Sequence, residues 1–114
     1  MGNTGYRTVA IKTDGAGAAE VEVAFRGALR AVRVELGTLS TPDFVIKDQP
    51  ADVNLLTVAG VASDTTYYPQ VATNDPADGT AGDAFTSPVV FGKIVITVAG
   101  GGASKSGYVR LIGE

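Results

Sequence analysis

Short runs of alternating apolar and polar residues restrict the fold of this 114-residue chain more than any other feature. The clearest run spans residues 18–25, where Val21, Val23 and Phe25 are separated by glutamate or alanine. Successive side chains of a β-strand point to opposite faces, so such a run predicts a strand with one buried face. The 15 valines and 12 threonines agree with this, because β-branched residues favour strands. We therefore predict an all-β protein.

Eight such runs are separated by turn-forming residues, mainly Gly, Pro, Asp and Ser. We predict one antiparallel β domain over residues 1–114, a β-sandwich or small barrel of about seven to eight strands. Residues 1–5 are predicted to be a flexible N-terminal arm, and residues 60–88 one long loop excursion. The predicted strands are 6–13, 18–25, 28–36, 43–47, 53–59, 66–71, 89–99 and 108–112.

The dipeptide Arg26-Gly27 predicts a tight hairpin between the second and third of these strands. A two-residue loop at this point sets Val21 opposite Val32 on the buried face. The same register puts Arg30 on the buried side as well, unless Arg30 lies beyond the edge of the core or a β-bulge turns it outward.

Three further segments have predicted places in the sheets. Residues 53–59 are apolar on both faces, which predicts a central strand covered on two sides or a strand that faces a partner. Gly92 interrupts the run 89–99 and predicts a β-bulge. The glycine-rich segment 100–107 predicts a flexible hairpin loop before the closing strand.

The composition disfavours most enzyme chemistry. The chain has no His and no Cys, so it lacks the usual zinc ligands, the thiol nucleophile and the commonest general base near neutral pH. We predict a protein that is not an enzyme and that has no metal and no cofactor. A net charge of −3 without a basic cluster predicts no nucleic-acid partner. No membrane partner is expected, since no run approaches about 18 apolar residues, and the start of the chain predicts no secretion signal.

Lys105-Ser106 follows a run of glycines and invites comparison with a phosphate-binding P-loop. That motif needs G-x-x-x-x-G-K-[ST] between a strand and a helix, so that backbone N–H groups converge on the phosphate. Here Ser104 stands where the second Gly is required and Ala99 where the first is required. We interpret the segment as a plain loop followed by a strand.

Asp75, Asp78 and Asp83, with Asn74 and Gly79, offer the hard oxygen ligands that calcium prefers. Their spacing does not match the EF-hand pattern, and Asp-Pro and Asp-Gly are ordinary turn residues. We interpret the segment as a series of turns, with calcium binding as the alternative.

Glu20 and Glu22 are expected on one strand face, roughly 7 Å apart, a separation that overlaps the geometry of glycosidase carboxylates. We predict them on an open solvated face beside Arg33. Acid–base catalysis needs a pocket, and nothing in the sequence suggests one. The pair therefore has no predicted catalytic role.

The aromatic residues of the chain concentrate at Tyr67-Tyr68-Pro69. Neighbours on an extended segment point to opposite sides, so we predict one ring in the core and one near the surface. Because Tyr is enriched at binding surfaces, an interface anchor is the alternative. Together with the residue that follows the N-terminal arm, the candidate interface residues are Tyr6, Tyr67, Tyr68 and Pro69.

The order of segments along most of the chain carries one resemblance. The segments are a Gly-rich start before the first strand, Phe25-Arg26-Gly27, residues 39–48, Tyr67-Tyr68-Pro69, residues 88–102 and residues 107–111. In this order they resemble small β-rich virion structural proteins of tailed bacteriophages, of the type that decorates capsids or occurs as a minor head or tail protein. The resemblance implies a viral, non-enzymatic protein and carries over no catalytic residue.

This resemblance and the inert composition predict a capsid decoration or cementing protein of a bacteriophage. It would bind the assembled capsid surface through loops, the N-terminal arm and exposed sheet edges. The expected partners are the major capsid protein or other virion proteins. A homo-oligomer is expected, with a trimer favoured, located in the virion after assembly in the host bacterial cytoplasm.

Two other functions stay open at this point. Within the virion, the chain fits a tail-tube, fibre or adaptor component. From a different class, it fits a carbohydrate- or surface-binding β-sandwich module that uses Tyr67, Tyr68 and a calcium-loaded acidic loop.

Overall fold

Nine β-strands account for the regular structure of residues 6–74, 81–86 and 88–113, the part of the chain that the computed structural model describes. The prediction of an all-β fold is confirmed. The predicted strands at residues 6–13, 43–47, 53–59, 89–99 and 108–112 agree with observed strands to within about two residues at each end. The strands are β1 (Tyr6–Lys12), β2 (Ala19–Glu35), β3 (Asp43–Asp48), β4 (Val53–Val58), β5 (Thr65–Tyr67), β6 (Val71–Asn74), β7 (Ala81–Thr86), β8 (Val89–Ala99) and β9 (Ser106–Gly113).

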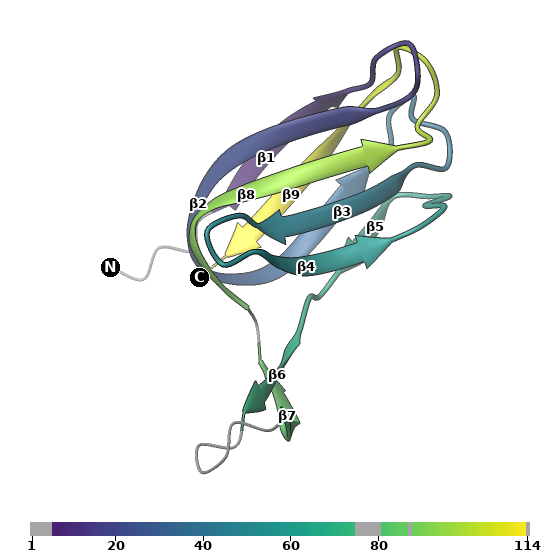
Figure 1. Ribbon diagram of the computed structural model, residues 1–114. Helices are drawn as coiled ribbons and strands as arrows, with labels where there is room; N and C mark the ends of the chain where they lie inside the picture. The colour runs from purple at the N-terminus through teal and green to yellow at the C-terminus, as the bar shows by residue number, and fades with distance from the viewer. Residues whose placement is uncertain (1–5, 75–80, 87, 114) are drawn as a thin grey trace.

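Two layers of antiparallel strands share one long strand. Hydrogen bonds join seven strands in the order β1-β9-β2-β8-β3-β4, with β5 added beside β2. Figure 1 shows that this set folds into a front sheet, β2-β8-β3-β4, and a back sheet, β1-β9-β2-β5. The protein is therefore an antiparallel β-sandwich, one of the two predicted architectures.

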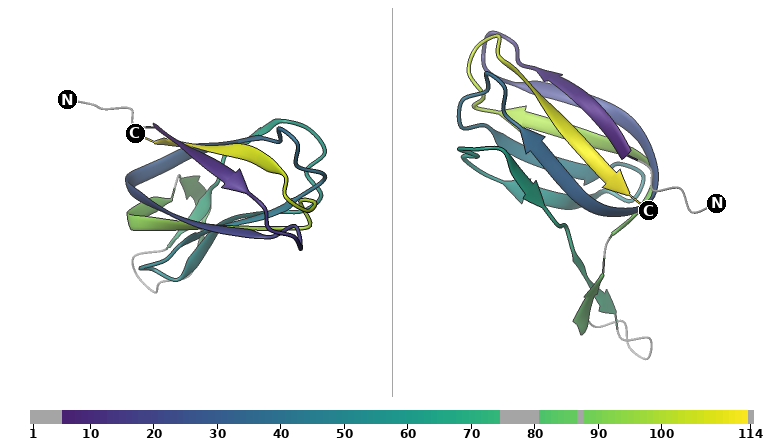
Figure 2. Two further views of the ribbon diagram at one scale, coloured as in Figure 1. Left: turned by 90° about the horizontal axis from the view of Figure 1, so that it is seen from above. Right: turned by 180° about the vertical axis from the view of Figure 1, so that it is seen from behind.

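Strand β2 is 17 residues long and passes from one sheet to the other. Residues 19–28 pair with β8 in the front sheet, whereas residues 29–35 pair with β9 and β5 in the back sheet. Gly27 lies near this change of sheet with a φ of 112°, a backbone conformation that is almost restricted to glycine. The two views in Figure 2 show the resulting curve of the strand around one side of the sandwich.

The predicted hairpin at Arg26-Gly27 is therefore wrong, because the chain bends there and does not reverse. Val21 lies opposite Ile96, and Val32 lies opposite Leu111. The alternation along the two halves of β2 does not distinguish a bend from a reversing turn, because the same side chains are buried in both cases. The choice depended on β8 and β9, which come more than 50 residues later and offer the two halves separate partners.

The β-bulge predicted as an alternative at Arg30 is confirmed. The register of β2 with β9 shifts between Leu29 and Ala31, which is a β-bulge at Arg30. The side chain of Arg30 is exposed, while Leu29 is fully buried. The bulge thus keeps a cation out of the core at the point where the strand enters the back sheet.

The core lies between the two sheets and is built from the inner residues of both. Each large apolar side chain that is fully buried there stabilises the fold by about 1.5 to 3 kcal/mol relative to exposure. The largest fully buried side chains are Phe44, Ile11, Leu29, Ile46, Ile94, Ile96, Leu111, Val32, Val34, Val90, Val98 and Val109.

Strand β4 is an edge strand, which contradicts the prediction of a central strand covered on both sides. It pairs with β3 and ends the front sheet. Its apolar character on both faces has another cause. The register with β3 shifts so that Leu55 has no residue opposite it, and Leu55 and Leu56 both turn towards the core. The second alternative, a partner on this strand, stays a prediction.

Two predictions for the last third of the chain are also wrong. Gly92 forms no bulge, because the register of β8 with β2 runs without a shift and sets Gly92 opposite Phe25. Residues 100–105 form no hairpin loop, because they join β8 of the front sheet to β9 of the back sheet. Nor is that loop loosely held, since hydrogen bonds tie it to the turn after β1.

The predicted excursion over residues 60–88 leaves the sandwich after a short strand. That strand, β5, was expected at residues 66–71 and occurs at Thr65–Tyr67 beside β2. The sequence reasoning missed β6 and β7, which pair with each other and with no other described strand. Figures 1 and 2 show this two-stranded ribbon projecting away from the body of the sandwich.

Replacing Gly27 tests the role of the bend. Gly27→Ala is expected to lower the free energy of unfolding by about 1 to 3 kcal/mol, because alanine does not readily adopt the φ that β2 needs there. Urea unfolding followed by circular dichroism measures the change.

Gly15→Ala is the matched control. Gly15 has no positive φ, and no atom lies within 4 Å of the position of an added Cβ. The control is expected to change stability by at most about 0.5 kcal/mol. Equal effects of the two substitutions would contradict a special role for Gly27.

Candidate interaction surfaces

The four predicted interface residues lie at the two opposite edges of the back sheet. Tyr67 is in β5 and Pro69 follows it, whereas Tyr6 begins β1, where its backbone lies opposite Ile112. Because the back sheet runs β1-β9-β2-β5, two strands separate Tyr6 from Tyr67. The structure therefore brings Tyr67, Tyr68 and Pro69 together but leaves Tyr6 apart from them.

Tyr67 and Tyr68 point in opposite directions, as predicted. Tyr67 is half-buried and packs against the core, while the side chain of Tyr68 is 70% exposed. Pro69 is buried. A large aromatic ring that is exposed to water between a half-buried and a buried neighbour is suited to contact another molecule. Of Tyr67, Tyr68 and Pro69, Tyr68 is the residue most available for such a contact.

The remaining predicted contact and calcium residues fall largely outside the description. Residues 1–5, the predicted arm, and Asp75, Asp78 and Gly79 of the calcium alternative are not among the described residues. Asn74 is the last residue of β6 and Asp83 lies within β7, and only the backbone of these two residues is described. Among the residues that are described, no three acidic side chains gather as a metal site would require.

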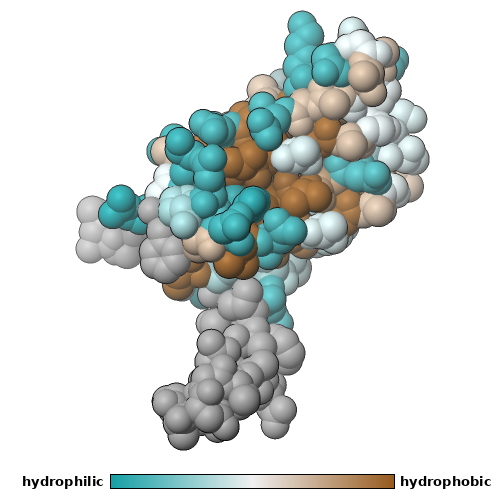
Figure 3. Space-filling model, viewed as in Figure 1, coloured by the Kyte–Doolittle hydropathy of each residue, from teal (hydrophilic) through white to brown (hydrophobic). Residues whose placement is uncertain are grey.

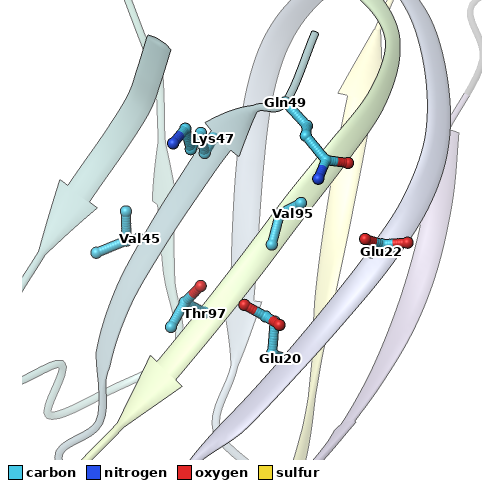
Figure 4. Close-up of a pocket in the computed structure, with 7 residues that line it drawn as sticks. All are labelled: Glu20, Glu22, Val45, Lys47, Gln49, Val95 and Thr97. Atoms are coloured by element: carbon cyan, nitrogen blue, oxygen red, sulfur yellow. The ribbon is translucent and has the colours of Figure 1, made fainter. Parts of the chain in front are cut away.

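The outer face of the front sheet is hollowed into a shallow depression of about 270 Å³. Figure 3 shows apolar side chains near the middle of this face with hydrophilic ones around them. Figure 4 shows the residues that line the depression, which are Glu20, Glu22, Val45, Lys47, Gln49, Val95 and Thr97. Among these lining residues there is no aromatic ring on which a sugar would stack.

Glu20 and Glu22 lie on the open face that was predicted for them, but with different neighbours. Both are exposed, and Glu22 forms an ion pair with Lys93 at 3.5 Å. Arg33 is not beside them, since it lies in the half of β2 that belongs to the back sheet. A pair of solvated carboxylates, one held by a lysine, lacks the apolar enclosure that a general acid requires.

The outer face of the back sheet carries a charged cluster that the sequence analysis missed. Glu35 forms ion pairs with two arginines: its Oε1 lies 3.6 Å from Nε of Arg33 and 3.2 Å from Nε of Arg110. The guanidinium of Arg33 also donates to the hydroxyl of Thr66 at 3.0 Å. Tyr108, opposite Glu35, is 50% exposed. The alternation of β9 contains the signal, because the exposed Tyr108 and Arg110 alternate with the buried Val109 and Leu111.

The two loops at one end of the sandwich are joined through Thr13. Its side chain is 3% exposed, donates from Oγ1 to the carbonyl of Gly102 at 2.6 Å and accepts from the N–H of Lys105 at 2.8 Å. Backbone bonds add to the junction, from Gly101 N–H to the carbonyl of Gly17 at 3.0 Å among others. In the segment compared with a P-loop, backbone N–H groups therefore already bond to the turn after β1, and the segment continues into β9 and not into a helix.

Asp14 closes the turn that belongs to the same junction. Its carboxylate accepts the N–H groups of Ala18 at 3.0 Å and Ala16 at 2.8 Å. These bonds, with that from Ala18 the larger influence, hold the pKa of Asp14 below its ordinary value. The turn is therefore most stable when this carboxyl group is ionised.

No protein-family model matches the chain, and no curated protein matches its sequence. Among the described residues there is also no helix that is long and apolar enough to cross a membrane.

Thr13→Val tests the loop junction. The isosteric change leaves the carbonyl of Gly102 and the N–H of Lys105 without their buried partner, and the free energy of unfolding is expected to fall by about 1 to 3 kcal/mol. Thr8→Val, on the exposed face of β1, is the control and is expected to change stability by less than about 0.5 kcal/mol. If both variants unfold at the same urea concentration, the junction does not stabilise the sandwich.

Asp14→Asn tests the pKa of Asp14. Because the folded-state pKa is lowered, the stabilisation is present above the unfolded pKa and is lost as pH falls through the folded value. The variant is expected to be less stable than the original at neutral pH, and the difference is expected to shrink well below pH about 3.9. Urea midpoints measured across this range check it, and a difference that does not depend on pH would contradict it.

Proposed function

We propose that this protein is a non-enzymatic structural component of a bacteriophage virion, a decoration protein that binds the assembled capsid. The observation that carries the proposal is the ribbon of β6 and β7, which projects from a tightly hydrogen-bonded sandwich. A ribbon of this kind reaches beyond the body and offers backbone groups to another protein. The major capsid protein is the proposed partner.

The body of the molecule supports a structural role. The depression on the outer face of its front sheet is shallow, and the carboxylates there are solvated. The chain has neither His nor Cys. On a lattice of identical sites, weak contacts by such a body act together, because each bound copy is held at several points.

The sequence resemblance to small virion proteins of tailed bacteriophages supports the same class of function. A tail component is the second candidate within that class, since a projecting ribbon also suits the contact between successive subunits of a tube. The carbohydrate-binding alternative has less support, because Tyr67 is half-buried and leaves Tyr68 as the exposed ring of the pair.

Labelling of intact particles tests the proposal. Phage particles are purified from cells that carry the gene and are stained with gold-coupled antibodies against this protein. Label over the head surface, with many copies per particle in quantitative mass spectrometry, is the expected result. Label confined to the tail would favour the second candidate, a tail component. Absence of the protein from purified particles would overturn both candidates.

Tyr68→Ala tests the predicted interface residue in the same assay. Loss of an exposed aromatic anchor typically weakens binding about tenfold or more, so the number of copies per particle is expected to fall several-fold. Tyr108→Ala is the matched control, because it removes an exposed tyrosine from the outer face of the back sheet. Equal loss from both variants would rule out a specific contact at Tyr68.

A further inference from the structure

The four free edges of the sandwich differ in how they are protected against pairing with another strand. Natural sheets protect their edges with charges, with β-bulges, or by keeping the edge strand short. At the edges of the back sheet, β1 carries Arg7 and Lys12, and β5 has only three residues. In the front sheet, the free side of β2 carries Glu20 and Glu22. The fourth edge, β4, has six residues and no charge, and the shift in register at Leu55 is the one protecting feature among these that it carries.

Strand β4 presents both hydrogen-bonding groups and apolar surface. Among the described strands only β3 pairs with it, so its outer edge has no strand beside it. Val53 is 44% exposed at one end, and Leu56 and Val58 are half-buried. Figure 1 shows β4 as the last strand of the front sheet. An uncharged apolar edge of this length is a site for strand addition.

The sequence of β4 identifies what fits this edge. It reads Val-Asn-Leu-Leu-Thr-Val, so apolar and polar positions are the same in both directions along the strand. The shift in register at Leu55 turns Leu55 and Leu56 to the inner side, while Asn54 and Thr57 are exposed. Two antiparallel copies therefore match row by row. Pairing about a two-fold axis between the leucines sets Val53 opposite Val58, Asn54 opposite Thr57 and Leu55 opposite Leu56 of the second copy.

We infer that the protein forms a symmetric dimer in which β4 pairs with β4 of a second copy, in place of the trimer that was favoured from the sequence. The two front sheets then become one sheet in the order β2-β8-β3-β4-β4-β3-β8-β2. A two-fold contact uses the same edge of both copies and leaves no second β4 free, so the assembly closes at two subunits. Each outer end of the joined sheet carries Glu20 and Glu22, whose like charges oppose further growth.

Charge changes at the exposed pair test the inferred register. In Asn54→Glu/Thr57→Glu, like charges face each other twice across the two-fold axis. In Asn54→Glu/Thr57→Lys, opposite charges face each other at the same two places. Asn54 and Thr57 are both exposed, and Asn54 lies opposite Lys47 within its own subunit, where a glutamate has a favourable neighbour. Each variant is therefore expected to fold. Circular dichroism and urea unfolding check this.

Analytical ultracentrifugation from micromolar to millimolar concentrations measures the result. The original chain is expected to sediment as a reversible dimer of twice the 11.6 kDa monomer mass. The double-glutamate variant is expected to dissociate with a dissociation constant raised roughly tenfold or more, and the glutamate–lysine variant to remain a dimer. A monomer throughout the range, a trimer, or a dimer that is indifferent to both variants would overturn the inference.

Discussion

Hydrogen bonding along β2 determines how the two layers of the sandwich are joined. The front half of the strand is tied to β8 and the back half to β9 and β5, so one continuous backbone belongs to both sheets. Because the same strand supplies Phe25 to one layer and Val32 to the other, the inner faces meet in a fixed register. Gly27 makes this possible, since its backbone conformation lets the ladder bend without an interruption by a loop.

The rest of the architecture follows from that shared strand. A sandwich joined on one side by a continuous strand has its free edges at β1, β4, β5 and the first half of β2. The loops between layers then cross one end of the molecule, where Thr13, in the loop after β1, bonds to Gly102 and Lys105 of the loop after β8. A rigid body of this kind places its variable surfaces at edges and projections, and these are where binding is proposed.

The candidate surfaces were only partly predictable. Alternation across Tyr67-Tyr68 was sufficient to predict one inward and one outward ring, because it depends on neighbouring residues alone. The cluster of Arg33, Arg110 and Glu35 was not found, since it forms between strands that are separated by more than 70 residues in the chain. The ribbon of β6 and β7 was missed because it lies in a segment rich in Gly, Pro and Asp, which resembles turns more than strands.

The sequence by itself determined the class of the fold, the position of most strands and the face that each one buries. Alternation is a local property, set by a residue and its second neighbours, and apolar burial enforces it wherever the strand is placed. Only the tertiary structure decided that β2 bends at Gly27 instead of reversing, that β4 ends a sheet, and that residues 100–105 connect two layers. Each of these depends on the partner a strand finds, and those partners lie far away along the chain. The local sequence pattern does not identify the partners of a strand. A strand that bends and two strands joined by a reversing turn have the same side chains facing inward, and so do an edge strand and a central strand.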